Sequence, residues 1–451
     1  MSCTTKSVLR LEKYRSVTGK GDFIATALDL KKQTKLYGNN STFLYYMDIG
    51  VLYHYAGEYD SSTAYLLQAS KIYDDLFAHS VTNEAASLLV NDNVRPYRSK
   101  PYELTFLHQL LQFNYLSVNQ PDEALVEARS TQLMFNEWER KNAKDNRYFT
   151  DGMFHYITSL IYDEQGQTDD AMISLFKAVQ AYQQGPVSLP KAVSDQTYSL
   201  FQKNNRATDI DRLKLAAPSN KTDIENDQTE IVVVGFAGIG PALIENEWWG
   251  DWIKGGILVL HHSTSDGKEE TMAFPAPDIP GSGKSPSTVF IKVALPALKT
   301  YSSETSHFSV EGAPGISPVS TYVIGDLDQQ AQKQLEDAKG SLFARTIIRV
   351  VTHTLAAQEA KKKMATNSPF ANLLIGLGTD VLSSQLEKAD TRCCFFIPKT
   401  VQIARIPVKP GNYSITVSAR NNGGAVLSTK TFPNLDVKAH KKKFVVYCSF
   451  R

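Results

Sequence analysis

The chain has 451 residues, 42% of them hydrophobic, and its 48 Lys and Arg residues nearly balance its 47 Asp and Glu residues. This length favours two or three domains, and the charge balance excludes a general electrostatic attraction to nucleic acid or to an anionic membrane. No run of about 18 apolar residues occurs, so the sequence predicts no transmembrane helix.

The cysteines define neither a metal site nor a disulfide framework. Cys3, Cys393, Cys394 and Cys448 show no CxxC spacing, and four cysteines are too few to staple a chain of this length. We expect buried free thiols among them. The start MSCTTKS has two interpretations: a cytosolic start, or the end of a trimmed secretory signal with Cys3 as the acylated residue.

The first strong helical pattern covers residues 43–76, after a short amphipathic helix predicted within 22–36. Small and aromatic residues recur there at the spacing of a tetratricopeptide unit, in which two antiparallel helices touch at small side chains. The residues that carry this pattern are Gly50, Tyr53, Gly57, Tyr59, Ser62 and Ala69. Any other amphipathic helical hairpin is the competing interpretation.

Two further units are predicted at residues 105–138 and 152–185, each with a turn near its middle and small residues after it. The starts at 43, 105 and 152 lie farther apart than the repeat period of about 34 residues, so inserts separate the units. One more helix, within 191–214, is predicted to cap the array. The helical repeat domain is therefore placed at residues 19–215.

The insert between the first two units, residues 83–103, is the best candidate for a site. Its arginines offer forked donors to a carboxylate of a partner peptide or of the protein itself. The candidate partner-binding residues are Asn91, Asp92, Asn93, Arg95, Tyr97, Arg98 and Tyr102. The alternative is that the insert is a structural connector that sets the angle between repeat units.

Residues 216–229 are polar and rich in helix breakers, and they are predicted to be a linker. Beyond them the pattern changes to strands, which places an α+β, β-rich domain at residues 230–451. Residues 327–364 predict a long inserted helix or a broken pair of helices, and residues 370–387 a buried helix. The chain ends in four predicted strands, and the alternation at Tyr413, Ile415 and Val417 and at Val445 and Tyr447 is typical of a half-buried antiparallel sheet. The predicted fold class is thus α+β and multidomain, a helical repeat array followed by this sheet.

Several short motifs fail the spacing that their chemistry needs. GSGKS at 281–285 lacks the first glycine of a P-loop, and GFAGIGPA at 235–242 lacks a small residue at 243. His261 and His262 are adjacent, so on a strand they point to opposite faces and do not chelate one ion. The triple-lysine runs at 361–363 and 441–443 are interpreted as solvated surface. The alternatives are phosphate contact and, for the second run, a charged edge that keeps the final strand from pairing. We therefore predict no catalytic, cofactor-binding or metal-binding residues.

The chain resembles a family of bacterial envelope proteins with tetratricopeptide helices, usually made as lipoproteins. The segments that carry the resemblance are GKGDF at 19–23, YYMDIGVLYHYAGEYDSS at 45–62, NEAASLLVNDNVRPYRSKPYE at 83–103, PDEALVEAR at 121–129 and GMFHYITSLIYDEQG at 152–166. Sparser matches follow at 231–241, 290–296 and 388–417. The family has a Trp shortly after DTR, where this chain has Cys393, Cys394 and Phe395.

The resemblance implies helical repeats before a mostly β domain, a lipid-anchored tether at residues 1–18 with Cys3 acylated, and location at the periplasmic face of the outer membrane. The function expected is a non-enzymatic scaffold for cell-wall or outer-membrane assembly. It would bind a protein or peptide partner, and no nucleic acid, on the concave face of the repeats. The alternatives are an envelope protein that binds glycan or peptide, and a peptidoglycan hydrolase.

Overall fold

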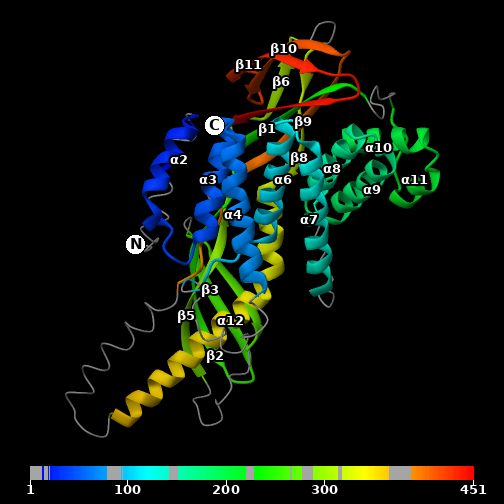
Figure 1. Ribbon diagram of the computed structural model, residues 1–451. Coiled ribbons are helices and arrows are strands. Elements are labelled where there is room, and N and C mark those ends of the chain that lie inside the picture. Colours follow the sequence, from blue (N-terminus) through cyan, green and yellow to red (C-terminus); the bar gives the residue numbers. More distant parts are fainter. Residues whose placement is uncertain are drawn as a thin grey trace.

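The computed structural model describes residues 13–14, 19, 21–78, 93, 95–141, 151–219, 228–264, 267–276, 288–312, 317–364 and 388–451. Helices occupy this part of the chain up to Leu213, and strands begin at Glu230 (Figure 1). Within it, no helix is both long and apolar enough to cross a membrane. Cys3, Asn91, Asp92, the motif at 281–285 and the predicted helix at 370–387 lie outside the described residues.

The N-terminal half consists of antiparallel helices that stand side by side (Figure 1). The pairs α3–α4, α6–α7 and α8–α9 coincide with the three predicted units, so helical hairpins are present there. That they form a tetratricopeptide array stays a prediction. The helices are α2 (Phe23–Lys32), the 3-10 helix η1 (Thr34–Leu36), α3 (Thr42–Ala56), α4 (Tyr59–Ala78), α6 (Pro101–Ser117), α7 (Pro121–Lys141), α8 (Gly152–Glu164), α9 (Thr168–Gln184), α10 (Lys191–Lys203) and α11 (Ala207–Leu213).

Small residues bring α3 and α4 together, as the sequence pattern predicts for one hairpin. A Cβ atom on Gly50 would lie 2.8 Å from the side chain of Leu66, and the hydroxyl of Ser62 donates to the carbonyl of Gly50 at 2.8 Å. Gly57 ends α3 with a left-handed φ of 83°, which an L side chain rarely adopts. The close helix contact and the tight turn therefore depend on these residue types.

The strands of the C-terminal half form three four-stranded sheets in the part of the chain that is described. Sheet A has the order β12-β1-β9-β8, sheet B the order β4-β3-β2-β5 and sheet C the order β11-β10-β6-β7. Their strands are β1 (Glu230–Ile239), β2 (Ala242–Ile253), β3 (Ile257–Ser263), β4 (Glu269–Pro275), β5 (Thr288–Lys299), β6 (His307–Glu311), β7 (Val319–Ser320), β8 (Tyr322–Asp326), β9 (Pro398–Pro407), β10 (Gly411–Arg420), β11 (Val426–Val437) and β12 (Lys442–Ser449).

Strand β1 lies at the centre of the molecule, between two layers. It pairs in parallel with β12, with Glu230 opposite Lys442, and antiparallel with β9, with Glu230 opposite Pro407. Among the described strands, the β1–β12 pair is the parallel exception in sheets that are otherwise antiparallel, as predicted. Val232 and Val234 pack in the core shared with the helices, and Ile231 and Val233 pack in the core shared with sheet C. A strand buried on both faces reads as a continuous apolar run, as here.

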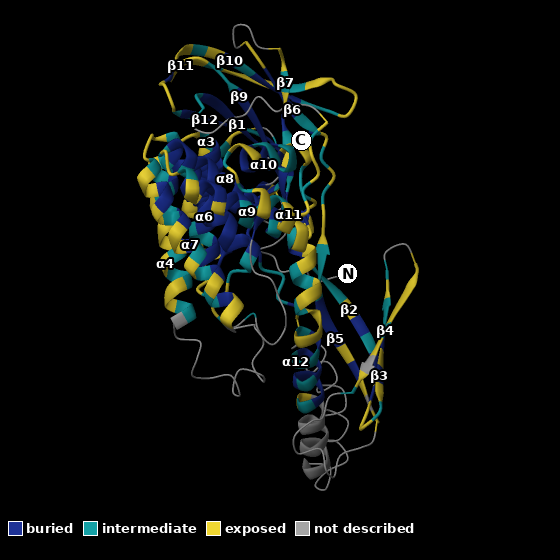
Figure 2. Ribbon diagram, turned by 90° about the vertical axis from the view of Figure 1, so that its right-hand side faces the viewer, coloured by how far each residue is buried: buried dark blue, intermediate teal, exposed yellow. Residues whose placement is uncertain are grey.

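The inner helices of the three hairpins pack directly on sheet A, and Figure 2 shows the buried layer between them. Phe236 of β1 contacts Phe106 and Phe113 of α6, with ring centroids 6.0 Å away in each case. On α8, the hydroxyl of Tyr156 lies 3.0 Å from that of Tyr322 on β8. One core thus joins the predicted helical and β-rich domains, and sheet A covers the inner face of these helices.

Sheet B and the long helix α12 (Leu327–Met364) form an arm that extends away from this body (Figures 1 and 2). Phe343 and Ile347 of α12 pack with Trp252, Leu260 and Ile291 of the sheet. The long helix was predicted, whereas β2 was not. Only Gly240 and Pro241 separate β2 from β1, and the sequence analysis assigns no strand to residues 243–253.

The prediction that the lysine run at 441–443 is solvated surface is wrong for Lys442. The side chain of Lys442 is fully buried, and its Nζ donates to Asp163 on α8 at 2.7 Å. Nζ of Lys441 reaches the carbonyl of Glu164 at 3.4 Å. These lysines tie the start of β12 to the helices, a role that a charge run does not reveal.

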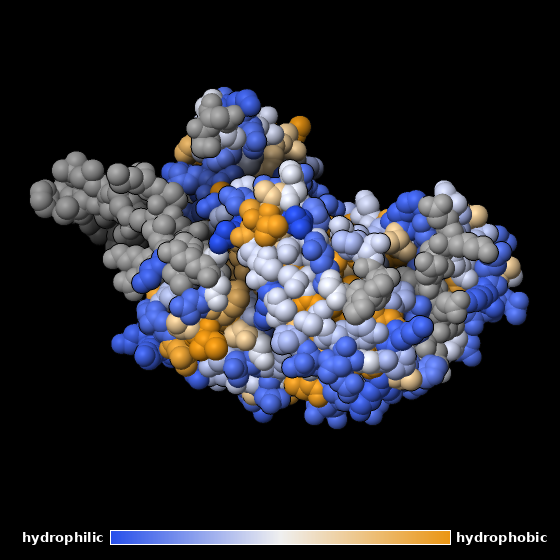
Figure 3. Space-filling view, turned by 90° about the horizontal axis from the view of Figure 1, so that it is seen from above, coloured by the Kyte–Doolittle hydropathy of each residue, from blue (hydrophilic) through white to orange (hydrophobic). Residues whose placement is uncertain are grey.

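Seen from above, the molecule presents a mostly hydrophilic face with small, separate apolar spots (Figure 3). A face without a broad apolar patch does not identify an interface by hydrophobicity alone.

Candidate functional site at the Arg345 cavity

The described end of the predicted insert, residues 95–102, meets the segment 388–397 that precedes β9. Arg392 holds the two together. Its Nε and Nη2 each donate to Asp390 at 2.8 Å, and its Nη1 donates to the carbonyls of Asn40 and Arg95 at 3.0 Å. Its guanidinium also lies 5.3 Å from the ring centroid of Tyr97. The pairing is strong, because ionised partners with two parallel hydrogen bonds combine charge and geometry.

Beneath this contact, the buried carboxylate of Glu103 collects three donors. It accepts the hydroxyl of Tyr97 at 2.5 Å, the backbone N–H of Lys100 at 3.0 Å and that of Cys394 at 2.8 Å. Burial, followed by the charge of Glu103, raises the pKa of Tyr97 well above its usual value, which keeps the phenol a donor. Glu103 also caps α6, because its carboxylate accepts the backbone N–H of Lys100, the N-cap residue of the helix.

A cavity of about 290 Å³ lies between residues 95–102, the strands β2 and β5, and α12. We call it the Arg345 cavity. Its apolar lining comes from the insert, from the two strands and from one stripe of α12 at helical spacing. These apolar residues are Pro96, Leu243, Pro296, Leu298, Ala331, Leu335, Ala338 and Leu342. Its polar lining consists of Arg95, Tyr97, Arg98, Lys100, Tyr102, Arg345, Asp390 and Arg392.

Positive charge exceeds negative charge around this cavity. Asp390 is the one acidic side chain in the described lining, and it is paired with Arg392. Burial opposes ionisation of Asp390, but the hydrogen bonds and charge of Arg392 outweigh burial and lower the pKa of its carboxyl. Nε of Arg345 is buried without a hydrogen-bond partner among the described residues. A buried nitrogen of this kind costs stability unless it binds an acceptor.

The structure brings most of the predicted site residues to this place. Arg95, Tyr97, Arg98 and Tyr102 line the cavity, and the two tyrosines are buried. Asn93 lies at the neighbouring junction, where its side chain donates to the carbonyls of Lys388 and Ala389 at 3.1 and 3.2 Å. The described part of the insert therefore contacts the segment before β9 and forms one wall of a cavity. Whether it sets the angle between repeat units stays a prediction.

Sequence reasoning missed the opposite wall. Arg345 follows Ala331, Leu335, Ala338 and Leu342 on one stripe of α12, and the sequence analysis predicts a helix there but no site. An arginine at the end of an apolar stripe was the available signal. Arg392 was noticed only as part of a motif. Its neighbour Phe395 is buried, and its backbone N–H donates to Asp48 of α3 at 2.8 Å.

The paired histidines of β3 have separate surroundings. Nδ1 of His261 lies 3.1 Å from the carboxylate of Glu269, whereas Nδ1 of His262 lies 2.8 Å from the carbonyl of Glu247. The ring of His262 also packs on Trp248, with 4.9 Å between centroids. In the described ranges, no group of three or more His, Cys, Asp or Glu side chains is arranged to hold a metal ion.

Comparisons with family models, with curated proteins and with solved structures find no match to this chain. The resemblance to envelope lipoproteins therefore stays a prediction, carried by the sequence segments alone. The chemical character of the Arg345 cavity, apolar on one side and cationic on the other, is the observation from which a function is argued.

Proposed function

We propose that this protein is a non-enzymatic adaptor of the bacterial cell envelope, which binds a protein or peptide partner in the Arg345 cavity. The observation that carries the proposal is the lining of this cavity, in which an apolar stripe of α12 ends at Arg345 and further basic side chains are present. Nε of Arg345 is buried and has no hydrogen-bond partner among the described residues. The envelope assignment comes from the sequence resemblance. A role in cell-wall or outer-membrane assembly is part of the same proposal.

The cavity chemistry favours one kind of partner group. An apolar side chain would fill the space beside Leu335 and Ala338, and a carboxylate beside it would accept from Arg345. Arg95 and Arg98, on the facing wall, would add positive charge around that carboxylate. The partner segment is therefore expected to carry an acidic residue, or a free C-terminal carboxylate, next to an apolar residue.

A site-specific crosslink in the native host tests this assignment. A photoreactive residue at Ala338, which lines the cavity, should capture a partner, and the capture should fall when Arg345→Met is added. The control position is Gln332, which is exposed on the same helix. No crosslinked partner at Ala338, or equal capture at Gln332, would contradict an adaptor site here.

Binding of the cell wall itself is the competing envelope function, because peptide stems also carry carboxylates beside small apolar groups. Soluble peptidoglycan fragments distinguish it from the adaptor. The adaptor proposal predicts no saturable binding of these fragments in calorimetry, and no release of soluble products from purified cell walls. Hydrolysis of the walls together with an absence of protein partners would replace the adaptor with a hydrolase.

Acylation of Cys3 and attachment to the outer membrane belong to the proposal as well. A single acyl chain binds membranes only marginally, so stable attachment needs more than one chain. Metabolic labelling with an alkynyl fatty acid should mark the protein, and Cys3→Ser should abolish the label and move the protein to the soluble fraction. Label that persists in the variant would refute this anchor.

A further inference from the structure

Strand β12 forms one edge of sheet A, and its outer side faces away from β1. The backbone N–H of Glu230 donates to the carbonyl of Lys441 at 3.1 Å, so residue 441 points its polar backbone atoms toward β1. These groups alternate from side to side along a strand. The N–H and C=O groups of Val446 and Cys448 therefore point outward, away from β1.

These outward groups have no backbone hydrogen-bond partner within the described ranges. An edge strand with unpaired N–H and C=O groups is a template for another strand, and many proteins cover or distort such edges. Here β12 is not covered along its last residues, because a cavity runs beside them.

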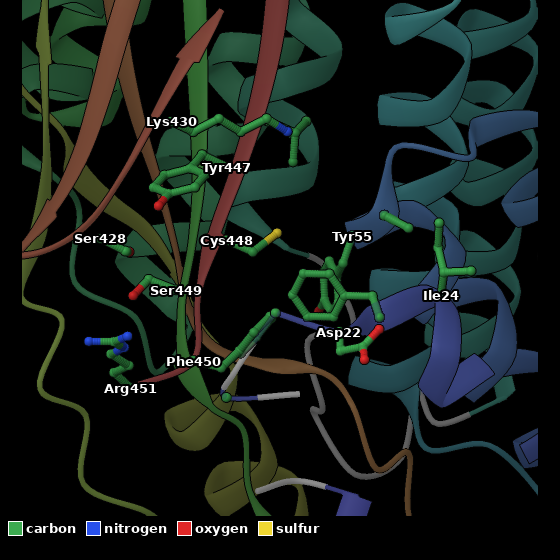
Figure 4. A pocket seen from close by; sticks show the side chains of 15 residues that line it. Asp22, Ile24, Tyr55, Ser428, Lys430, Tyr447, Cys448, Ser449, Phe450 and Arg451 are labelled. Atoms are coloured by element: carbon green, nitrogen blue, oxygen red, sulfur yellow. The ribbon is translucent and has the colours of Figure 1, made fainter. Parts of the chain in front are cut away.

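The cavity has a volume of about 430 Å³ and lies between the edge of β12, the helices α2 and α3, and strand β11. We call it the β12 groove. Figure 4 shows the side chains of Cys448 and Tyr447 on opposite sides of the strand, with Tyr55 beyond Cys448 and Ser428 on the side of Tyr447. The groove therefore has one wall of helices and one wall of sheet C strands, with an open strand edge between them.

The helix wall is apolar. The ring of Tyr55 packs against Phe23 and Phe450, with centroids 5.5 and 4.8 Å away. Ile24 lines the groove and is 43% exposed, although it is a large aliphatic residue. The acidic residue on this side, Asp22, accepts from the N–H of Ala25 at the start of α2, so the helix terminus balances its charge.

The opposite wall is polar and basic. It presents Ser428, Lys430 and Arg451, and Lys430 is exposed above the ring of Phe432. A side chain entering from this direction would meet hydroxyl and cationic groups. Because consecutive residues of an extended segment point to alternate sides, the two walls together select a pattern of alternating residue types.

We propose that sheet A takes up an additional strand at this edge: an extended segment of a partner protein, with apolar residues alternating with acidic or hydroxyl residues. Its backbone pairs with Val446 and Cys448, its apolar side chains pack on Ile24 and Tyr55, and its polar side chains face Lys430. Strand addition of this kind takes affinity from the main chain and specificity from alternate side chains. The groove shares no lining residue with the Arg345 cavity, so the proposal is independent of the proposed function.

A peptide array tests the pairing on the full chain. The probes are synthetic peptides of about eight residues with aliphatic or aromatic residues at alternate positions and Glu, Asp, Ser or Thr between them. We expect at least one sequence to bind, and we expect its binding to slow hydrogen exchange at the amides of Val446 and Cys448. Absence of any binder across the array, or protection elsewhere with none at these amides, would overturn the proposal.

Two variants of Cys448 distinguish the contribution of its backbone N–H from that of its side chain. Cys448→Pro removes an outward N–H, which an edge strand tolerates, and Cys448→Ala retains it. We expect the Pro variant to bind the selected peptide about tenfold or more weakly than the Ala variant, a difference of about 1.4 kcal/mol. Equal affinities in two folded variants would refute backbone pairing.

Backbone methylation of the selected peptide provides a readout that does not alter the protein. Two versions of the peptide carry N-methyl groups, one at the odd and one at the even positions. One version should bind about tenfold or more weakly and the other nearly unchanged, since only alternate N–H groups of the peptide point toward β12. Equal effects in both registers would overturn the proposal, even if the Pro variant fails to fold. A protein that dimerises through β12 in place of binding the peptides would also contradict it, and sedimentation would reveal the dimer.

Discussion

Glu103 and Cys394 lie 291 positions apart in the chain, and the backbone N–H of Cys394 donates to Oε1 of Glu103 at 2.8 Å. This bond joins the start of an array helix to the segment before β9. The same carboxylate orients Tyr97, which lies under Arg392. One buried acid thus connects the helical array, the described insert and the wall of the Arg345 cavity.

Glu103→Gln should destabilise the fold by about 2–5 kcal/mol. The amide oxygen of the glutamine would still accept hydrogen bonds. Its NH₂ group, however, would face N–H or O–H donors that the other carboxylate oxygen of Glu103 accepts in the wild type. The matched control is Glu58→Gln at an exposed position, with an expected change within about 0.5 kcal/mol. Urea unfolding of both variants measures the difference, and equal midpoints would contradict this role for Glu103.

The buried side chains of Glu230 and Arg405 should contribute to the free energy of unfolding jointly and not independently. Nε and Nη2 of Arg405 donate to the two carboxylate oxygens at 2.7 and 2.5 Å. Burial alone would lower the pKa of Arg405, but the charge of Glu230 outweighs it and raises that pKa. Arg405→Met should cost about 3–5 kcal/mol, because it leaves Glu230 buried and unpaired.

Adding Glu230→Met to Arg405→Met should recover most of that loss, since the double variant buries no charge. Chemical unfolding of the wild type, the two single variants and the double variant forms a thermodynamic cycle. Additive single losses would show that the two side chains contribute independently, against this prediction.

Glu164 should make the folded state less stable as the pH rises. Burial raises the pKa of Glu164 from 4.5 to about 7, although Lys441 and Lys442 act in the opposite direction. Between these values the folded state holds a proton that the unfolded state has lost, so stability decreases with pH. The full cost, roughly 3 kcal/mol, is present above about pH 7.

Glu164→Gln should therefore be more stable than the wild type near pH 8 and should lose this part of the pH dependence. Unfolding at several pH values from about 4.5 to about 8 measures the difference between the two proteins. A difference that stays constant across this range would show that Glu164 does not titrate there.

Two glycine-to-alanine substitutions should act in opposite directions. A Cβ atom on Gly235 would lie 2.3 Å from the ring of Phe308, so Gly235→Ala should cost about 1–3 kcal/mol. Gly340 lies inside α12 with nothing within 4 Å of such an atom, so Gly340→Ala should add about 0.5–1 kcal/mol. Melting temperatures check both signs, and a shift in the same direction for both would contradict them.

The helical hairpins were predictable because their signals are local. Gly50 and Ser62 are small where α3 and α4 touch, and Gly57 adopts the left-handed turn after α3. The packing of sheet A on the inner face of these hairpins was not predictable from local signals. Phe106 and Phe113 would read as the same apolar stripe whether they meet a partner or the protein's own Phe236.

The candidate site likewise has one wall with a local sequence signal and one wall without it. Arg95 and Arg98 were recognised because they lie in a polar, proline-marked insert. Arg345 was not, because an arginine on a helix otherwise reads as solvated surface. The close approach of α12 to residues 95–102 depends on contacts between distant parts of the chain, such as the bond from the N–H of Tyr102 to Gln334.

The central position of β1 also has a consequence for biosynthesis. Helices α2 to α11 precede every strand of sheet A in the chain, and β9 and β12, which flank β1, follow it by more than a hundred residues. A chain that lacks these strands is expected to expose apolar surface of the inner helices that the full-length protein buries, and exposed apolar surface favours aggregation. A truncation before β9 should therefore yield an aggregation-prone product, although all the helical hairpins are present in it.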